Sequence, residues 1–237
     1  MESVRYNPGR DARWLLLRPW ISIPRVLQIV WALSGLVLSL LIRGNSSDPK
    51  VQRNLARMLL RTLTNLGPCF IKVGQALSTR PDLIRRDWLD ELTKLQDDLP
   101  AFSHATALKT IETELGSPAD QLFEEFPDCP VAAASLGQVY KARVHGEHWV
   151  AVKVQRPNLM FILRRDMVLI RSLGVLTAPF LPLNLGFGLG EIIDEFGRSL
   201  FEEIDYFCEA DNAERFAALF ANNPAVTIPT VERSLSS

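Results

Sequence analysis

Residues 131–155 read VAAASLGQVYKARVHGEHWVAVKVQ, and this stretch decides the fold. It holds two apolar segments rich in β-branched residues, separated by the polar turn His145-Gly146-Glu147. Apolar segments on either side of a short polar turn with glycine are typical of a β-hairpin. We therefore predict two antiparallel strands, the second of which ends near Lys153.

An alanine-rich turn at the start of this stretch matches a phosphate-loop template, the kinase motif G-x-G-x-x-G-x-V. The template's glycines fall on Ala132, Ala134 and Gly137, its valine falls on Val139, and the strand motif V-A-I-K ends on Lys153. Glycine lets a loop adopt φ > 0 and press its N–H groups against phosphate, and a Cβ opposes both. The spacing predicts a nucleotide-binding lobe with an altered lid. An alanine-rich hairpin with a tolerated lysine is the alternative.

Length and net charge limit the number of domains and the classes of partner that the chain can have. The 237 residues suffice for one large or two modest domains, and a net charge of −1 with a pI of about 6.3 gives no global sign of nucleic-acid binding. Cys69, Cys129 and Cys208 are odd in number and widely spaced, and the three histidines are not clustered. We predict no metal site, and buried thiols in a reducing compartment.

An uncharged apolar segment, VLQIVWALSGLVLSLLI, lies between Arg25 and Arg43. As a helix it would extend roughly 25 Å at ~1.5 Å per residue, against a hydrocarbon core of about 30 Å. Tryptophan and arginine residues near it suit the membrane interface. We predict membrane contact, as a single span or as a helix on the surface. A helix buried against protein is the alternative.

Breaks in the pattern divide the chain into three parts. Residues 1–49 form a basic, tryptophan-bearing apolar segment, residues 50–128 a helical extension, and residues 129–237 an incomplete small lobe. After the hairpin, four further segments are predicted: helices at 158–177 and 191–221, a Pro/Gly-rich linker at 178–190, and an extended piece at 225–231.

The predicted helix at 191–221 is acidic. Four of its polar side chains recur at spacings of three and four, which predicts one common face: Glu202, Asp205, Glu209 and Asn212. Glu203 lies at the edge of an apolar face, where a carboxylate needs a cation. A solvated acidic face is the alternative.

A kinase-like lobe needs a glutamate on the helix that faces its strand lysine. Glu209 and Glu203 are both candidates, and spacing does not choose between them. Upstream, Gly67-Pro68 opens another helix, on which Lys72 and Gln75 share one face. Solvent exposure is the simple interpretation of that pair. Pointed inward, they would contact Glu203 or phosphate oxygens.

Taken together, these residues resemble the UbiB-type atypical kinase-like family, also called the aarF-domain kinases, over about residues 60–235. The resemblance is carried by five motifs in order: K-x-G-Q at 72–75, an Ala-rich loop at 132–135 (Ala132, Ala133, Ala134 and Ser135), the strand lysine Lys153, E-x-D at 203–205 and E-A-x-N at 209–212.

The resemblance implies an α+β fold, a kinase-like N-lobe with a small antiparallel sheet and a large helical extension. It implies that Glu209 pairs with Lys153 and that Lys72 pairs with Glu203. The implied catalytic set is Lys72, Gln75, Glu203, Asp205 and Glu209. The implied nucleotide-binding set is Ala132, Ala133, Ala134, Ser135, Gly137, Val139, Ala151 and Lys153.

The resemblance also implies a setting. Family members bind ATP or ADP, sit at membranes and support prenyl-quinone metabolism (ubiquinone, plastoquinone or tocopherol). The opening Arg5-Tyr6-Asn7-Pro8 is similar to cyanobacterial and plastid members, which implies a thylakoid, inner-membrane or plastid location with the lobe on the cytoplasmic or stromal face. Membrane lipid or proteins of the quinone pathway would be the partners.

One departure from the kinase pattern is large. Arg164-Arg165-Asp166 imitates the catalytic loop without its asparagine, and Glu195-Phe196-Gly197 imitates D-F-G with the wrong acid. We therefore expect a fragment without the large lobe, inactive alone, whose Mg²⁺ ligands belong to that lobe. A non-catalytic membrane-associated regulator and a poorly folded truncated product are the alternatives.

Overall fold

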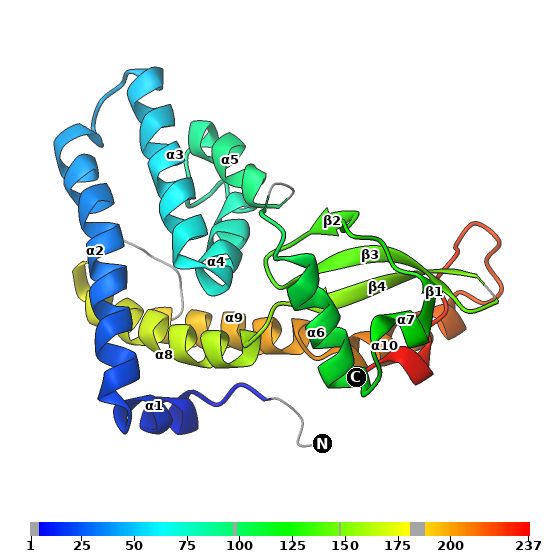
Figure 1. Cartoon of the computed structure of the whole chain (residues 1–237). Coiled ribbons are helices and arrows are strands. Elements are labelled where there is room, and N and C mark those ends of the chain that lie inside the picture. The colour runs from blue at the N-terminus through cyan, green and yellow to red at the C-terminus, as the bar shows by residue number, and fades with distance from the viewer. Residues whose placement is uncertain (1–4, 97–98, 147, 181–187) are drawn as a thin grey trace.

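A computed structural model describes residues 5–96, 99–146, 148–180 and 188–237 of the chain. Helices form most of it, and a small antiparallel sheet lies at one end (Figure 1). This is the predicted fold class.

The N-terminal half is a helical extension. Its elements are α1 (Pro8–Leu16), α2 (Pro19–Arg43), α3 (Pro49–Leu66), α4 (Pro68–Ser78), α5 (Arg86–Leu92) and the 3-10 turn η1 (Thr93–Leu95). The first four helices each begin with proline, whose missing N–H costs nothing in the first turn. Leucines from α3 and α5 form the core of this part, together with Phe70 and Ile71 of α4, Ile29 of α2 and Leu169.

The sheet has four strands: β1 (Phe123–Glu125), β2 (Ala132–Ala133), β3 (Gly137–Val144) and β4 (Trp149–Gln155). The predicted hairpin is confirmed, since β3 pairs antiparallel with β4 in the register Val139 to Lys153. In its turn, Gly146 has φ 71° and Glu147 lies outside the described residues. The helical extension predicted at 50–128 is wrong near its end, because Phe123–Glu125 form β1, which pairs with β3.

One face of the sheet is covered and the other is open. Tyr140, Ala142 and Val154 pack on α6 (His104–Leu115), and α7 (Ala119–Leu122) leads into β1. Lys153 points to the opposite face, because side chains alternate along a strand.

The C-terminal part is helical: α8 (Leu159–Thr177), the 3-10 turn η2 (Ala178–Phe180), α9 (Leu189–Glu203), α10 (Tyr206–Leu219) and the 3-10 turn η3 (Arg233–Leu235). The single helix predicted at 191–221 is wrong. It is two helices, and Asp205 caps the second by accepting a hydrogen bond from Cys208 N at 3.0 Å. No strand is assigned at 225–231, and residues 181–187 of the predicted linker lie outside the described residues.

Two long-range connections join the parts. Leu136, at the tip of the β2–β3 turn, is buried with Cys69 of α4, Met167 of α8 and Phe201 of α9. Arg25 of α2 donates to both carboxylate oxygens of the fully buried Asp166 of α8, at 3.0 and 2.7 Å. Among the described residues, α2 is the one helix long and apolar enough to cross a membrane.

Candidate functional site

Lys153 and Glu209 meet on the open face of the sheet. The Lys153 ammonium donates to both carboxylate oxygens of Glu209 on α10, at 2.9 and 2.6 Å. The two side chains are 40% and 53% exposed, so they remain reachable from solvent. Of the two glutamates that spacing allowed, Glu209 is the one in contact with this lysine.

Tyr206 lies beside this pair and was not among the predicted site residues. Its ring lies under the Lys153 ammonium, with 4.6 Å from Nζ to the ring centroid. Burial, together with the nearby Glu209 and Glu203 carboxylates, raises the pKa of the Tyr206 hydroxyl, so the phenol stays protonated at neutral pH. That hydroxyl is buried without a hydrogen-bond partner in the described part of the chain. Its position directly after E-x-D was the available sequence signal.

The alanine-rich turn is closed by its own backbone and by one arginine. Ala134 N–H donates to Gly137 O at 2.8 Å, and Ser135 and Leu136 form the buried tip. Arg156 donates from its backbone N to Leu136 O at 2.9 Å and from Nη2 to Ala134 O at 3.0 Å. The turn is therefore anchored to the body of the protein.

The remaining predicted nucleotide-binding residues surround Lys153. Ala132 and Ala133 pair with Val139 and Gln138 of β3. Val139 pairs directly with Lys153, and Ala151 lies two residues before it on the same strand face. Small apolar side chains thus line the sheet beside the ammonium group.

Lys72 and Gln75 of the K-x-G-Q segment contact different parts of the protein. Lys72 is only 18% exposed and forms an ion pair with Glu203, so the solvent-exposed interpretation does not hold for it. Gln75 donates instead to Leu95 O at 2.6 Å, which ties α4 to η1. Gly74 lies between them because a Cβ there would meet Leu95 Cδ1 at 2.4 Å.

Asp205 has a local structural contact. As the N-cap of α10 it accepts from Cys208 N, which sets where the helix carrying Glu209 begins. On the preceding residue, Ile204 O accepts a hydrogen bond from Gln155 Nε2 of β4 at 2.9 Å. The α9–α10 break is therefore held against the strand that carries Lys153.

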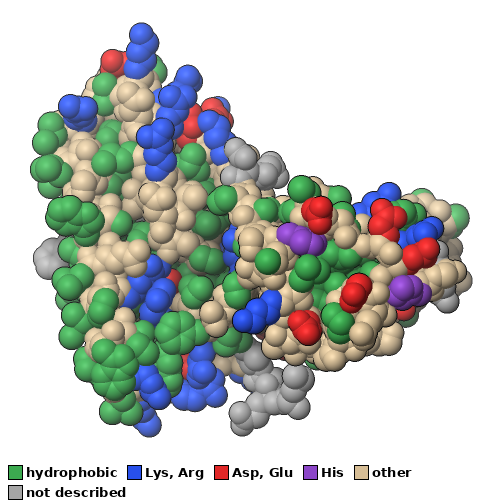
Figure 2. Space-filling model, viewed as in Figure 1, with side chains coloured by type: hydrophobic (Ala, Val, Ile, Leu, Met, Phe, Trp, Pro, Cys, Tyr) green, Lys and Arg blue, Asp and Glu red, His purple; other side chains and the backbone are tan. Residues whose placement is uncertain are grey.

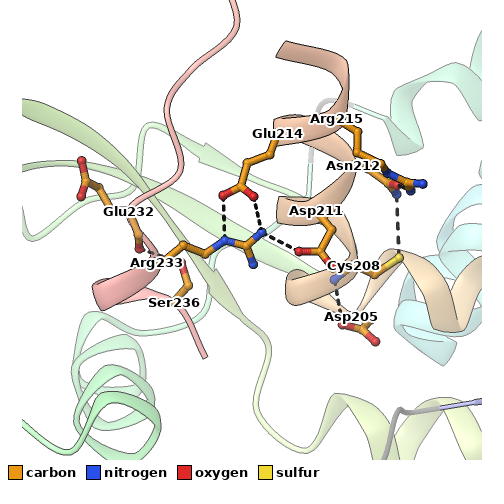
Figure 3. A network of polar contacts seen from close by, with 9 residues as sticks. All are labelled: Asp205, Cys208, Asp211, Asn212, Glu214, Arg215, Glu232, Arg233 and Ser236. Carbon is orange, nitrogen blue, oxygen red and sulfur yellow. Dashed lines mark hydrogen bonds and ion pairs between the residues drawn. The ribbon is translucent and has the colours of Figure 1, made fainter. Parts of the chain in front are cut away.

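The other flank of α10 contacts the C-terminal segment (Figure 3). Arg233 donates to both oxygens of Glu214, each at 2.8 Å, and to Asp211 Oδ1 at 2.5 Å. Hydrogen bonds from Arg233 hold the pKa of Glu214 below its usual range. Helix α10 therefore forms ion pairs on both sides, with Lys153 on one side and with Arg233 on the other.

The two kinase-like triplets in this chain are structural. Asp166 is fully buried between Arg25 and Arg165. Glu195 pairs with Arg198 on the surface of α9. In the described ranges, no three His, Cys, Asp or Glu side chains come close enough to hold a metal ion.

Comparison with known proteins places this geometry in a family. The ABC1 atypical kinase-like domain matches residues 94–237. An uncharacterized protein of Synechocystis is 48% identical over 96% of this chain and 40% of its own length. The chloroplastic protein ACTIVITY OF BC1 COMPLEX KINASE 1 of Arabidopsis thaliana is 44% identical over 90% of this chain and 32% of its own length. The chain therefore belongs to the ABC1 atypical kinase-like family.

A solved structure is also similar. It is the complex of Rv3197 with erythromycin from Mycobacterium tuberculosis, at 33% identity and a TM-score of 0.47 over 68% of this chain and 40% of that one. The chain spans two fifths or less of the length of each of these three relatives.

Proposed function

We propose that this chain is the nucleotide-binding half of a membrane-associated atypical kinase or ATPase that supports prenyl-quinone biosynthesis or homeostasis. The observation that carries the nucleotide part is the Lys153–Glu209 pair between β4 and α10, beside the alanine-rich turn. In kinase-like lobes such a lysine contacts nucleotide phosphates while a helix glutamate orients it.

The open face of the sheet fits ATP or ADP. Val139 and Ala151 offer a small apolar surface for a base, and Lys153 lies next to it as a cation for phosphate. Because the Ala134 N–H is already used inside the turn, phosphate recognition falls more on the ammonium group than on that amide. Bound nucleotide would supply a transferable phosphoryl group. This chain's part is to bind and orient it.

The setting in quinone metabolism rests on the family resemblance and on relatives from a cyanobacterium and a chloroplast. Membrane association is supported by α2, whose large apolar side chains are mostly exposed. The same observation favours the second candidate function, a non-catalytic membrane-associated regulator that binds lipid or a partner protein.

Nucleotide titration separates the two functions. Replacing Lys153 with alanine should weaken ATP or ADP binding at least tenfold, because the phosphate loses its cation and Glu209 is left unpaired. Fluorescence titration with a labelled nucleotide measures this. Lys109→Ala is the control, since Lys109 is an exposed lysine of α6, which covers the other face of the sheet. If the unsubstituted protein and both variants bound nucleotide with equal affinity, the proposed site would be excluded.

A further inference from the structure

One surface of the molecule is apolar and uncovered. The large apolar side chains of α2 that are at least half exposed are Trp20, Ile23, Leu27, Val30, Trp31, Val37, Leu38, Leu41 and Ile42, here called the apolar face of α2. At ~100° per residue they fall within an arc of about 140°. Figure 2 shows hydrophobic side chains along the edge of the molecule that α2 forms in Figure 1.

The opposite side of the same helix is packed on protein. Arg25, Ile29 and Leu36 are its buried residues, and they point about 170° away from the centre of the apolar face at ~100° per residue. Arg25 is held by Asp166 and also donates to Leu66 O at 2.5 Å, so α2 is fixed to both α8 and the end of α3. Helix α2 is therefore packed against the rest of the protein along one side and exposed along the other.

This attachment argues against a membrane span. Helix α3 packs along α2 and carries the exposed Arg53, Arg57 and Arg61. A spanning α2 would draw these guanidinium groups into the hydrocarbon or would have to break the buried Arg25–Asp166 pair. Both are costly, because charges inside a bilayer are expensive and a broken buried pair leaves a charge uncompensated.

Charge identifies the kind of membrane. Residues 1–61 hold ten Lys and Arg against three Asp and Glu, a formal balance of +7. Residues 62–237 hold the other sixteen against twenty-four, a balance of −8. The positive charge is therefore concentrated in the part of the chain that carries the apolar face. A basic segment with tryptophan and leucine on one helix face suits an anionic bilayer surface.

We infer that α2 lies in the plane of an anionic bilayer, with its apolar face in the headgroup–acyl boundary, and that it does not cross the membrane. This rests on the membrane contact of the proposed function and adds its geometry. Trp20 and Trp31 then lie at the same shallow depth, about 5–10 Å into the boundary. The sheet and the Lys153–Glu209 pair stay in water.

The test measures tryptophan depth in the intact chain bound to vesicles of phosphatidylcholine and phosphatidylglycerol, with lipids brominated at shallow or deep positions. The signals of Trp20 and Trp31 are obtained as differences from Trp20→Phe and Trp31→Phe variants. We expect both to be quenched best by shallow bromines and to equal extents. Trp149 of β4, read from Trp149→Phe, should not be quenched.

A paired substitution tests which residues make the contact. Leu41 and Leu219 are both 80% exposed, but only Leu41 belongs to the apolar face of α2. Leu38→Ser combined with Leu41→Ser should lower vesicle partitioning about tenfold, and Leu219→Ser should leave it unchanged. Nucleotide affinity should be the same in all of these variants, which keeps this test separate from that of the nucleotide site.

Three results would overturn the inference. A spanning helix would place Trp20 and Trp31 about 16 Å apart in depth, since eleven residues rise ~1.5 Å each. That result would leave membrane contact intact and remove only the in-plane geometry. If the protein did not bind vesicles at all, both the membrane contact and the in-plane geometry would be excluded. Self-association in solution that Leu38→Ser/Leu41→Ser abolishes would assign the apolar face of α2 to a second copy of the chain.

Discussion

At the scale of single residues, the alanine-rich turn shows which glycine of the template is needed for steric reasons. A Cβ on Gly137 would lie 2.5 Å from Val154 O and 3.1 Å from Tyr206 Oη. Ala132 and Ala134 are exposed, so their methyl groups have room. The position that stays glycine is therefore one where a Cβ would collide with the backbone of β4.

Gly137→Ala should lower the free energy of unfolding by about 1–3 kcal/mol, because the colliding atom is a backbone oxygen that cannot rotate away. Urea denaturation followed by circular dichroism measures this. Gly9→Ala is the control, since a Cβ there has 3.8 Å to its nearest neighbour. Equal stabilities of the two variants would show that the strands have room to separate.

At the scale of elements, a buried ion pair decides how α2 is oriented. Asp166 is fully buried on α8 and receives hydrogen bonds from Arg25 of α2 and from the adjacent Arg165. Removing one partner of such a pair costs more than replacing both with apolar groups. The pair therefore fixes which face of α2 turns away from the protein.

Asp166→Ala should destabilise the protein by about 3–5 kcal/mol, because it leaves Arg25 buried without a counter-ion. The double variant Arg25→Met/Asp166→Leu should recover much of that loss in the same denaturation measurement. Asp82→Ala, which breaks the exposed pair with Arg80, should change nothing measurable. A double variant less stable than Asp166→Ala would contradict this account.

At the scale of the whole molecule, the turn that borders the proposed nucleotide site is also part of the core between helices. Leu136 is 5% exposed and packs with residues of α4, α8 and α9. The sheet and the helical extension are further joined by Arg156, which donates to Pro100 O at 2.8 Å. The helical extension and the lobe should therefore unfold together.

Leu136→Ala should cost about 2–5 kcal/mol, as for other buried leucines, and should keep a single unfolding transition. Parallel tryptophan-fluorescence and circular-dichroism melts measure both properties, because the tryptophans lie mostly in the extension and the sheet holds only Trp149. Leu219→Ala, at an exposed position, is the control. Two separate transitions would show that the parts fold independently.

Local pattern was sufficient for the hairpin, for the helices of the extension and for the apolar character of α2, because these depend on residues a few positions apart. It misled where a long-range contact intervened. The acidic spacing runs unbroken through 202–212, yet the helix breaks at Ile204, whose carbonyl accepts from Gln155 of β4. Strand β1 was missed because a three-residue strand depends on its partner β3.

The sequence by itself determined the class of protein, because ordered motifs and local periodicity survive without knowledge of the fold. The family resemblance implied both ion pairs, but spacing left Lys153 with two candidate partners, and only the tertiary structure brings Lys153 into contact with Glu209, 56 residues away, and Lys72 into contact with Glu203. It also decided which face of α2 is free. These ion pairs and the orientation of α2 depend on which distant charges meet once the helices pack. Spacing along the chain does not determine that.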